Sequence, residues 1–103
     1  MTSAPTGPLA GLRILDMATV VAAPFGATLC ADAGAEVVKL ELPDGNDPLR
    51  GLAPTGLYWK VLNRGKAGIS LDVRQPAGRA LFLQLIAGFD VLVVHEDGRQ
   101  IGV

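Results

Sequence analysis

The stretch GLRILDMATVVAAPFGATLCADAGAEVVKLEL, residues 11–42, decides the fold. It contains a short apolar run at Leu12–Asp16, a helical segment from Pro24 to about Ala33, and a second apolar run at Glu36–Leu42. Pro24 suits the first turn of a helix, because the amide hydrogen that proline lacks would have no partner there. Two strands joined by a helix over about 30 residues form a right-handed crossover, so both strands are predicted to run parallel.

The remainder of the chain predicts a second unit of the same kind. A Pro- and Gly-rich segment, residues 43–57, is predicted as a long loop, and loops of this length in compact domains are usually functional. The run GISLD at 68–72 predicts a strand, the segment from Pro76 predicts a helix with one apolar stripe, and DVLVV at 90–94 predicts a buried strand.

The element order strand, helix, strand, loop, strand, helix, strand predicts an α/β fold with a partial Rossmann-like, mostly parallel open sheet. Residues 1–8 are expected to form a flexible tail, and residues 9–103 a single, incomplete domain. Only two helices are predicted for four strands, so one face of the sheet should remain partly uncovered. Half of the residues are hydrophobic and only 18% are charged, which agrees with burial against another polypeptide.

Composition excludes several classes of function. The net charge is −1 and no basic run occurs, so nothing indicates binding to nucleic acid or to an anionic membrane. The uncharged span from Met17 to Ala31 is shorter than the roughly 20 residues of a membrane helix, so we expect no membrane span. A single cysteine, Cys30, cannot form a disulfide within the chain, which favours a reducing compartment such as the cytoplasm.

The turn between the first strand and the first helix, residues 18–26, occupies the place where open α/β sheets bind ligands. It has no G-x-G-x-x-G, which disfavours NAD or FAD, although Glu41 ends the second strand where a ribose hydroxyl could bind. Five cations offer an alternative, since they could contact phosphates of an extended ligand; the other interpretation is a solvated basic turn. They are Lys39, Arg50, Arg64, Lys66 and Arg74.

Other candidates for chemistry are weaker. His95 follows the last strand beside Glu96 and Asp97, and either a catalytic dyad or an ordinary surface histidine fits this position. The acidic residues of segment 41–47 lack the spacing of a calcium loop, so no metal is predicted. Ser70 lies within a predicted strand and no G-x-S-x-G occurs, so no serine nucleophile is predicted.

Six motifs follow one another in a specific order: PLAGLRILD at 8–16, PF at 24–25, DAGAEVVK at 32–39, GNDPLR at 45–50, NRGK at 63–66 and SLDVRQPAGR at 70–79. In this order they resemble the N-terminal portion of the family III CoA-transferases, the CaiB/BaiF group of carnitine dehydratases and α-methylacyl-CoA racemases. The similarity extends from Pro8 to about Val94.

The resemblance implies the first part of a Rossmann-like domain that binds coenzyme A, or acyl-CoA as substrate, without a G-x-G-x-x-G. Leu42 and Ala67 stand where the family commonly has arginine, so two phosphate partners are missing. The residues implied at the CoA site are Val21, Ala22, Leu42, Leu71, Asp72, Val73, Arg74, His95, Glu96 and Asp97.

The resemblance also implies that the family's catalytic aspartate lies beyond Val103, and transferase chemistry needs that nucleophile to hold the acyl group. The chain is therefore expected to be catalytically incomplete. It would form a homo-oligomer or bind a second chain that carries the rest of the fold, since family members form interlocked dimers. Two alternatives stay open: a scaffold protein that has lost the ligand, and a standalone enzyme using His95 and Glu96.

Overall fold

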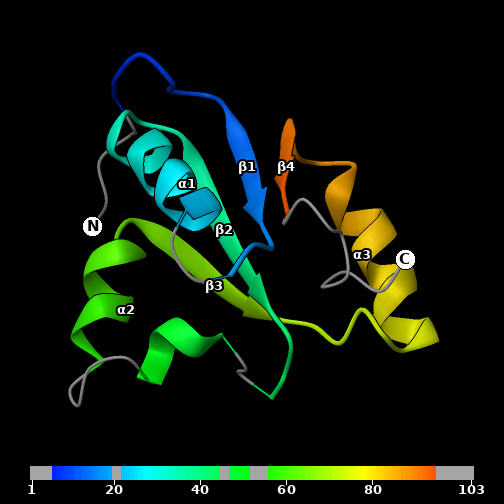
Figure 1. Ribbon diagram of the computed structural model, residues 1–103. Helices are drawn as coiled ribbons and strands as arrows, with labels where there is room; N and C mark the ends of the chain where they lie inside the picture. The colour runs from blue at the N-terminus through cyan, green and yellow to red at the C-terminus, as the bar shows by residue number, and fades with distance from the viewer. Residues whose placement is uncertain (1–5, 20–21, 45–46, 52–55, 95–103) are drawn as a thin grey trace.

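A four-stranded, all-parallel sheet with helices on both faces forms the molecule (Figure 1). The computed structural model describes residues 6–19, 22–44, 47–51 and 56–94. Its elements are β1 (Arg13–Asp16), α1 (Ala22–Asp32), β2 (Glu36–Glu41), the 3-10 helix η1 (Pro48–Gly51), α2 (Leu57–Leu62), β3 (Lys66–Ser70), α3 (Pro76–Ile86) and β4 (Val91–Val93).

The strand order is β3-β2-β1-β4. On β1, Ile14 pairs with Val37 of β2 and with Val91 of β4, and Lys39 of β2 pairs with Gly68 of β3. The predicted α/β class and the parallel crossover from β1 to β2 are therefore confirmed.

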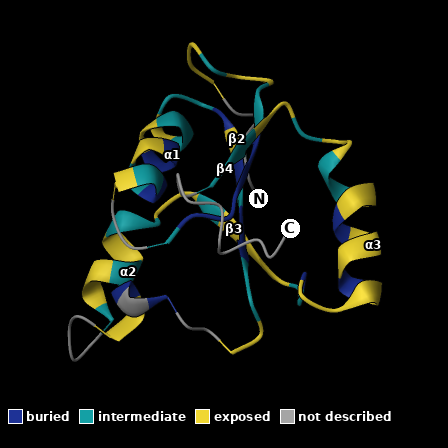
Figure 2. Ribbon diagram, turned by 45° about the vertical axis from the view of Figure 1, so that its right-hand side comes forward, coloured by how far each residue is buried: buried dark blue, intermediate teal, exposed yellow. Residues whose placement is uncertain are grey.

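Two hydrophobic clusters hold the layers together, one on each face of the sheet. Figure 2 shows α1 and α2 on one side of the sheet and α3 on the other. Ile14 and Val37 pack with Ala27 of α1, whereas Leu15 and Leu40 pack with Phe82 of α3. Successive residues of a strand point to opposite faces, so Asp16 and Lys39 return to the α1 side. The sheet therefore carries charged residues on a buried face.

Gly34 ends the turn after α1 with a φ of 104°, in the left-handed region that favours glycine. A Cβ on Gly34 would lie 2.5 Å from the carbonyl oxygen of Thr6. The amide of Leu9 also donates to the carbonyl of Ala33, at 3.0 Å. The segment from Thr6 to Leu9 is thus packed onto the C-terminal end of α1.

Two sequence predictions need correction. The sequence predicted two helices and a loop over residues 43–57. The structure adds the short helix η1 inside that segment and the helix α2 at its end. The helix α2 has six residues, too few for an apolar period, and it begins after Gly56 without a side-chain cap. The strand predicted at residues 68–72 lies instead at Lys66–Ser70, because the β2 register pairs Lys66 and Ala67 with Val37 and Val38.

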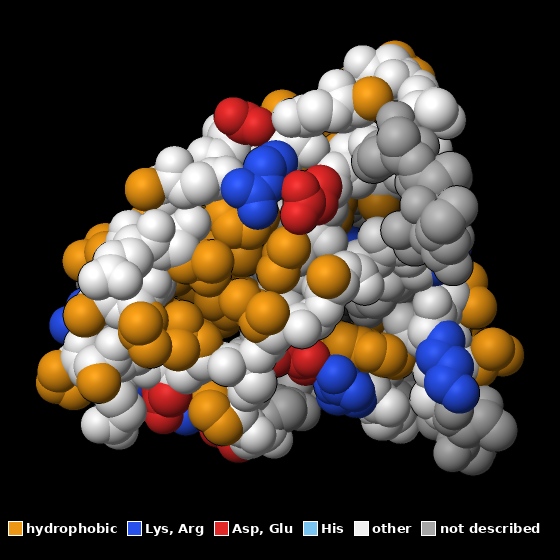
Figure 3. Space-filling view, turned by 180° about the vertical axis from the view of Figure 1, so that it is seen from behind, with side chains coloured by type: hydrophobic (Ala, Val, Ile, Leu, Met, Phe, Trp, Pro, Cys, Tyr) orange, Lys and Arg blue, Asp and Glu red, His pale blue; other side chains and the backbone are white. Residues whose placement is uncertain are grey.

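The face towards α3 is covered unevenly. Ala67 and Ile69 of the edge strand β3 pair with Val38 and Leu40 and so share their face, but both are exposed, with Ile69 at 37%. Figure 3 shows the molecule from behind relative to Figure 1, and hydrophobic side chains gather around a hollow on the side that faces the reader. The partly uncovered sheet face expected from the composition is therefore present over β3.

Within the described part of the chain, no helix has both the length and the apolar character needed to cross a bilayer.

Candidate functional site

A cavity of about 100 Å³ opens at the carboxyl ends of β1 and β2. Open parallel sheets bind ligands at this edge, since several strands and their following loops converge there. The volume exceeds that of one water, roughly 30 Å³, but is below the 300 Å³ or more of a pocket for a whole drug-sized ligand. It suits one end of an extended ligand. Its lining residues are Met17, Ala18, Thr19, Lys39, Leu40, Glu41, Leu42, Asp47 and Val73.

The sequence produces this cavity through two abrupt strand ends. β1 stops at Asp16, whose Oδ1 accepts a hydrogen bond from the amide of Ala18 at 3.0 Å and so turns the chain. β2 stops at Glu41, and Asp47 begins η1 by accepting the amide of Leu49 at 3.0 Å. Leu49 is 1% exposed, so η1 is fixed against the body of the protein. Both carboxylates act as local caps that hold the cavity's walls.

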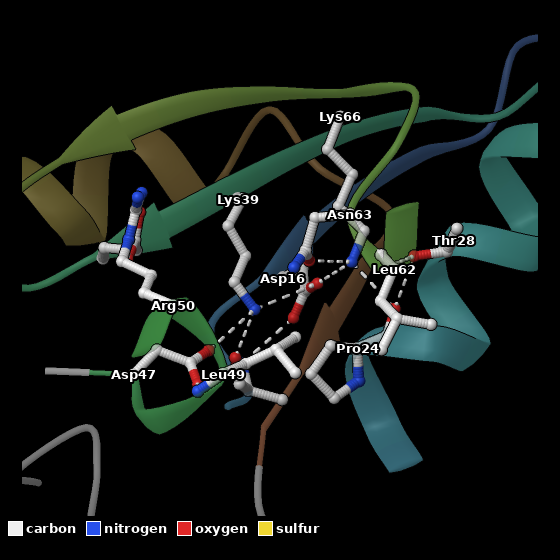
Figure 4. Close-up of polar contacts among 12 residues, drawn as sticks. Asp16, Pro24, Thr28, Lys39, Asp47, Leu49, Arg50, Leu62, Asn63 and Lys66 are labelled. Atoms are coloured by element: carbon white, nitrogen blue, oxygen red, sulfur yellow. Dashed lines mark hydrogen bonds and ion pairs between the residues drawn. The ribbon is translucent and has the colours of Figure 1, made fainter. Parts of the chain in front are cut away.

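Four buried charges form a cluster beside the cavity, and two of them, Lys39 and Asp47, line it (Figure 4). The Oδ2 atom of Asp16 lies 2.7 Å from Lys66 Nζ and 3.5 Å from Lys39 Nζ. Lys39 Nζ also lies 4.0 Å from Asp47 Oδ2. All four side chains are at most 4% exposed, so two lysines and two aspartates neutralise one another inside the protein. Such a cluster persists only when each charge has a partner, because an unpaired buried charge is costly.

Lys66 connects the sheet to the helices on the α1 side. Its ammonium donates to the carbonyl of Pro24 at 2.7 Å and to Asn63 Oδ1 at 2.9 Å, in addition to Asp16. The first turn of α1, the end of α2 and the end of β1 therefore converge on one nitrogen. The Thr28 hydroxyl, which donates to the carbonyl of Leu62, further joins α1 to α2.

Burial lowers the pKa of Lys39 below its ordinary value, and the nearby positive charge of Lys66 adds to this effect. Asp16 and Asp47 act in the opposite direction, yet burial dominates. Lys39 also donates to the carbonyl of Ala18, which fixes its ammonium at the inner end of the cavity. Its role in the folded chain is therefore to hold Ala18, Asp16 and Asp47 together.

The rim of the cavity carries two exposed ion pairs. Arg50 makes two hydrogen bonds to Glu41, at 2.9 and 2.6 Å, and its guanidinium lies 3.8 Å from the centre of the Trp59 ring. Arg74 donates to Asp72 at 2.9 Å and to Asp44 at 3.3 Å. The hydrogen bond from Arg74 lowers the pKa of Asp72. Both arginines are therefore neutralised by carboxylates, one by Glu41 and the other by Asp72 and Asp44.

The predicted site residues divide into three groups. Leu42 and Val73 line the cavity, and Leu71 packs against the same hydrophobic cluster. Asp72 and Arg74 pair on the surface beside Val73, whereas Ala22 is exposed at the start of α1 and does not line the cavity. The remaining predicted residues lie outside the described residues: Val21, His95, Glu96 and Asp97.

The prediction that five cations are available for ligand phosphates is wrong for Lys39 and Lys66, which are buried in internal ion pairs. The other three are also paired, Arg50 and Arg74 as described and Arg64 with Asp32 at 2.7 Å. The turn that begins at Ala18 was predicted as a ligand site and does line the cavity, whereas Met17 and Leu40 on the cavity wall were not among the predicted residues. Their position directly at predicted strand ends was the available signal.

The described residues contain no cluster of three or more His, Cys, Asp or Glu side chains that could hold a metal ion.

Comparison with known proteins identifies the family. The pattern of "CoA-transferase family III" matches residues 9–100, nearly the whole chain. This chain belongs to the CoA-transferase family III. The resemblance to the CaiB/BaiF group is thereby confirmed.

Curated relatives of this family III chain are CoA-transferases. It is 47% identical over 92 residues to the beta subunit of succinyl-CoA–L-malate CoA-transferase from Chloroflexus aurantiacus, covering 84% of the chain and 23% of that protein. It is 38% identical to acetyl-CoA:oxalate CoA-transferase from Acetobacter aceti, covering 85% of the chain and 24% of that protein. The family III chain therefore spans about a quarter of the length of these relatives and matches their N-terminal portion.

Solved structures give the same result for the fold of the family III chain. A CaiB/BaiF family protein from Brucella suis is 39% identical, with a TM-score of 0.73, over 84% of the chain and 25% of that structure. A hypothetical protein from Mycobacterium tuberculosis is 35% identical, with a TM-score of 0.77, over 85% of the chain and 25% of that structure.

Proposed function

We propose that this chain supplies part of the coenzyme A binding domain of an acyl-CoA transferase, and that the cavity at the ends of β1 and β2 receives the adenosine end of CoA. The observation that carries this proposal is an apolar-walled cavity at the ligand-binding edge of a parallel sheet in a family III chain. The curated relatives named above act on CoA esters of small carboxylic acids. The complete enzyme is therefore proposed to move CoA between two such acids.

The apolar walls favour a flat, uncharged ring as the part of the ligand that enters the cavity. Met17, Leu40 and Val73 are buried and apolar, and Leu42 is half-buried beside them. Apolar side chains favour burial of a heterocyclic base through the hydrophobic effect and dispersion. Because the cavity holds only one end of CoA, the pantetheine and thioester must extend beyond it, towards parts of the enzyme that other segments supply.

Titration with CoA tests the proposal, with Trp59 as the reporter. The Trp59 ring lies 5.9 Å from Lys39 Nζ, and Lys39 lines the cavity, so occupancy should change the fluorescence of the chain's one tryptophan. We expect a saturable change, and we expect Leu42→Glu to weaken binding at least about tenfold, because it adds a negative charge beside an anionic ligand.

The matched control is Leu83→Glu, which makes the same change on α3 at a side chain that is 62% exposed and lies outside both core clusters. It should bind CoA as the unmodified chain does. Equal weakening by both variants, or no saturable change at all, would contradict a CoA site in this cavity.

A scaffold that has lost CoA is the second candidate, and the exposed hydrophobic surface favours it. Large hydrophobic side chains that are at least half exposed occur on three helices: Leu29, Leu57, Tyr58, Leu81 and Leu83. Light scattering during the CoA titration separates the candidates. A stable homodimer with no response to CoA would support the scaffold.

We further propose that the described part of the chain does not carry out transfer by itself. A transferase needs a carboxylate that attacks the thioester, and the carboxylates at the cavity are held by cations. Asp16 is buried between two lysines, Asp47 lies against Lys39, and Glu41 is bound twice by Arg50. A second, different chain is proposed to supply the nucleophile, because a second copy would bring only the same carboxylates. We also propose a reducing, cytoplasmic setting, since Cys30 is the one cysteine of the chain and cannot form a disulfide within it.

Exchange of label between [¹⁴C]succinate and succinyl-CoA measures transfer without a choice of acceptor. The chain alone is expected to give the rate of the protein-free solution. The positive control is the Chloroflexus succinyl-CoA–L-malate CoA-transferase with both subunits. Exchange by the purified chain alone, clearly above the protein-free rate, would show that it carries its own nucleophile.

A further inference from the structure

We infer that the cavity recognises the neutral adenosine of CoA and not its ribose 3′-phosphate, so that this chain binds dephospho-CoA as tightly as CoA. The inference rests on the proposed CoA site and names its ligand specificity. It follows from the charged residues around the cavity within the described part of the chain.

The buried cluster offers no cation to a phosphate. Lys39 is the basic residue that lines the cavity, and its ammonium is engaged with the carbonyl of Ala18 and with Asp16 and Asp47. Lys66 is equally buried against Asp16. Two lysines and two aspartates sum to zero charge. Moving either lysine towards a ligand would leave a buried aspartate uncompensated, which is strongly unfavourable.

The two arginines at the rim are also neutralised. Arg50 is held by two hydrogen bonds to Glu41 and by its stacking on Trp59. Arg74 binds Asp72 and Asp44, and its backbone amide also donates to Asp72, at 3.0 Å. One arginine with two carboxylates leaves this part of the rim negative. Tight phosphate binding requires charge-assisted hydrogen bonds from cations that do not already serve a carboxylate.

Taken together, these four cations face five carboxylates, so the nine groups have a net charge of −1. A 3′-phosphate would gain no unpaired cation from these four described residues. The apolar wall of Met17, Leu40, Leu42 and Val73, by contrast, contacts a base equally well whether or not the ribose is phosphorylated. Affinity should therefore come from the base and not from the phosphate.

Isothermal titration of the 103-residue chain with CoA and with dephospho-CoA tests the inference. We expect dissociation constants within about threefold of each other, and a weak dependence on salt, because few ion pairs form on binding. CoA binding tenfold or more tighter than dephospho-CoA would overturn the inference and leave the proposed function standing. If neither ligand binds, both the inference and the proposed function are wrong.

The variant Leu42→Arg tests whether the lack of an unpaired cation at the cavity is the reason for equal affinities for CoA and dephospho-CoA. It places a new cation on the cavity wall and should make CoA about tenfold tighter than dephospho-CoA, whereas Leu83→Arg on the exposed side of α3 should leave the ratio near one. Circular dichroism establishes that both variants are folded. An unchanged ratio in folded Leu42→Arg would contradict the assigned cause, namely that the 3′-phosphate lies beside a cavity wall without an unpaired cation.

Discussion

Replacing Asp16 by asparagine is expected to reduce the free energy of unfolding by about 3–5 kcal/mol, because it removes one partner of a buried ion-pair cluster. Asp16 is fully buried, accepts hydrogen bonds from Lys66 and from the amide of Ala18, and forms an ion pair with Lys39 at 3.5 Å. Asparagine has the same shape but a single acceptor oxygen. Its NH₂ group would have to face either the ammonium groups or the Ala18 amide, and all of these are donors.

The loss is large relative to the total stability of a small domain, about 5–15 kcal/mol. Urea denaturation followed by circular dichroism measures it. The matched control is Asp32→Asn, which removes the same charge from a surface pair with Arg64 whose two side chains are each 44% exposed. Surface pairs contribute about 0–1 kcal/mol. Equal destabilisation by the two variants would show that the buried cluster has no special role.

Gly78→Ala is the second change with a large expected effect. Gly78 lies in the first turn of α3, and a Cβ there would be 1.8 Å from the carbonyl oxygen of Asp72 and 2.7 Å from its carbonyl carbon. Both are backbone atoms, so no side chain can rotate away. Either α3 or the turn that carries Val73 and Arg74 must shift. We expect destabilisation of about 1–3 kcal/mol or more, even though alanine is the better helix former by about 1 kcal/mol.

Gly26→Ala is the control, because Gly26 lies within α1 and a Cβ there would meet nothing within 4 Å. This variant should be more stable than the parent chain by about 0.5–1 kcal/mol. The two alanine variants should thus move the urea midpoint in opposite directions. A midpoint that rises in Gly78→Ala as well would contradict the close contact between α3 and Asp72.

The same contact gives a physical reason for part of the family resemblance. In SLDVRQPAGR, Asp72 begins the turn between β3 and α3, Pro76 begins α3, and Gly78 allows the helix to approach the backbone of Asp72. Pro76 needs no hydrogen-bond partner at this position. The motif therefore fixes how α3 enters the structure beside Val73 on the cavity wall.

Local sequence was sufficient for most of the fold. The apolar runs around Ile14 and Val37, with a helical segment and Gly34 between them, require a crossover of limited length, so parallel pairing follows from chain geometry. The helix α2 escaped prediction because its six residues are held by contacts with other elements, such as the bond from Thr28 to Leu62, and not by a cap or a period of their own.

The sequence alone determined the α/β class, the parallel sheet, the edge of the sheet at which the cavity lies, and the family. The tertiary structure alone determined which charged side chains are buried and which groups they pair with. Lys66 meets Asp16 from a position 50 residues away along the chain, and Lys39 meets it from the neighbouring strand. The neighbouring sequence does not distinguish a lysine that could bind a ligand phosphate from one that neutralises a buried carboxylate. That distinction depends on which groups share a desolvated space once the strands have paired, because only burial makes the missing partner costly.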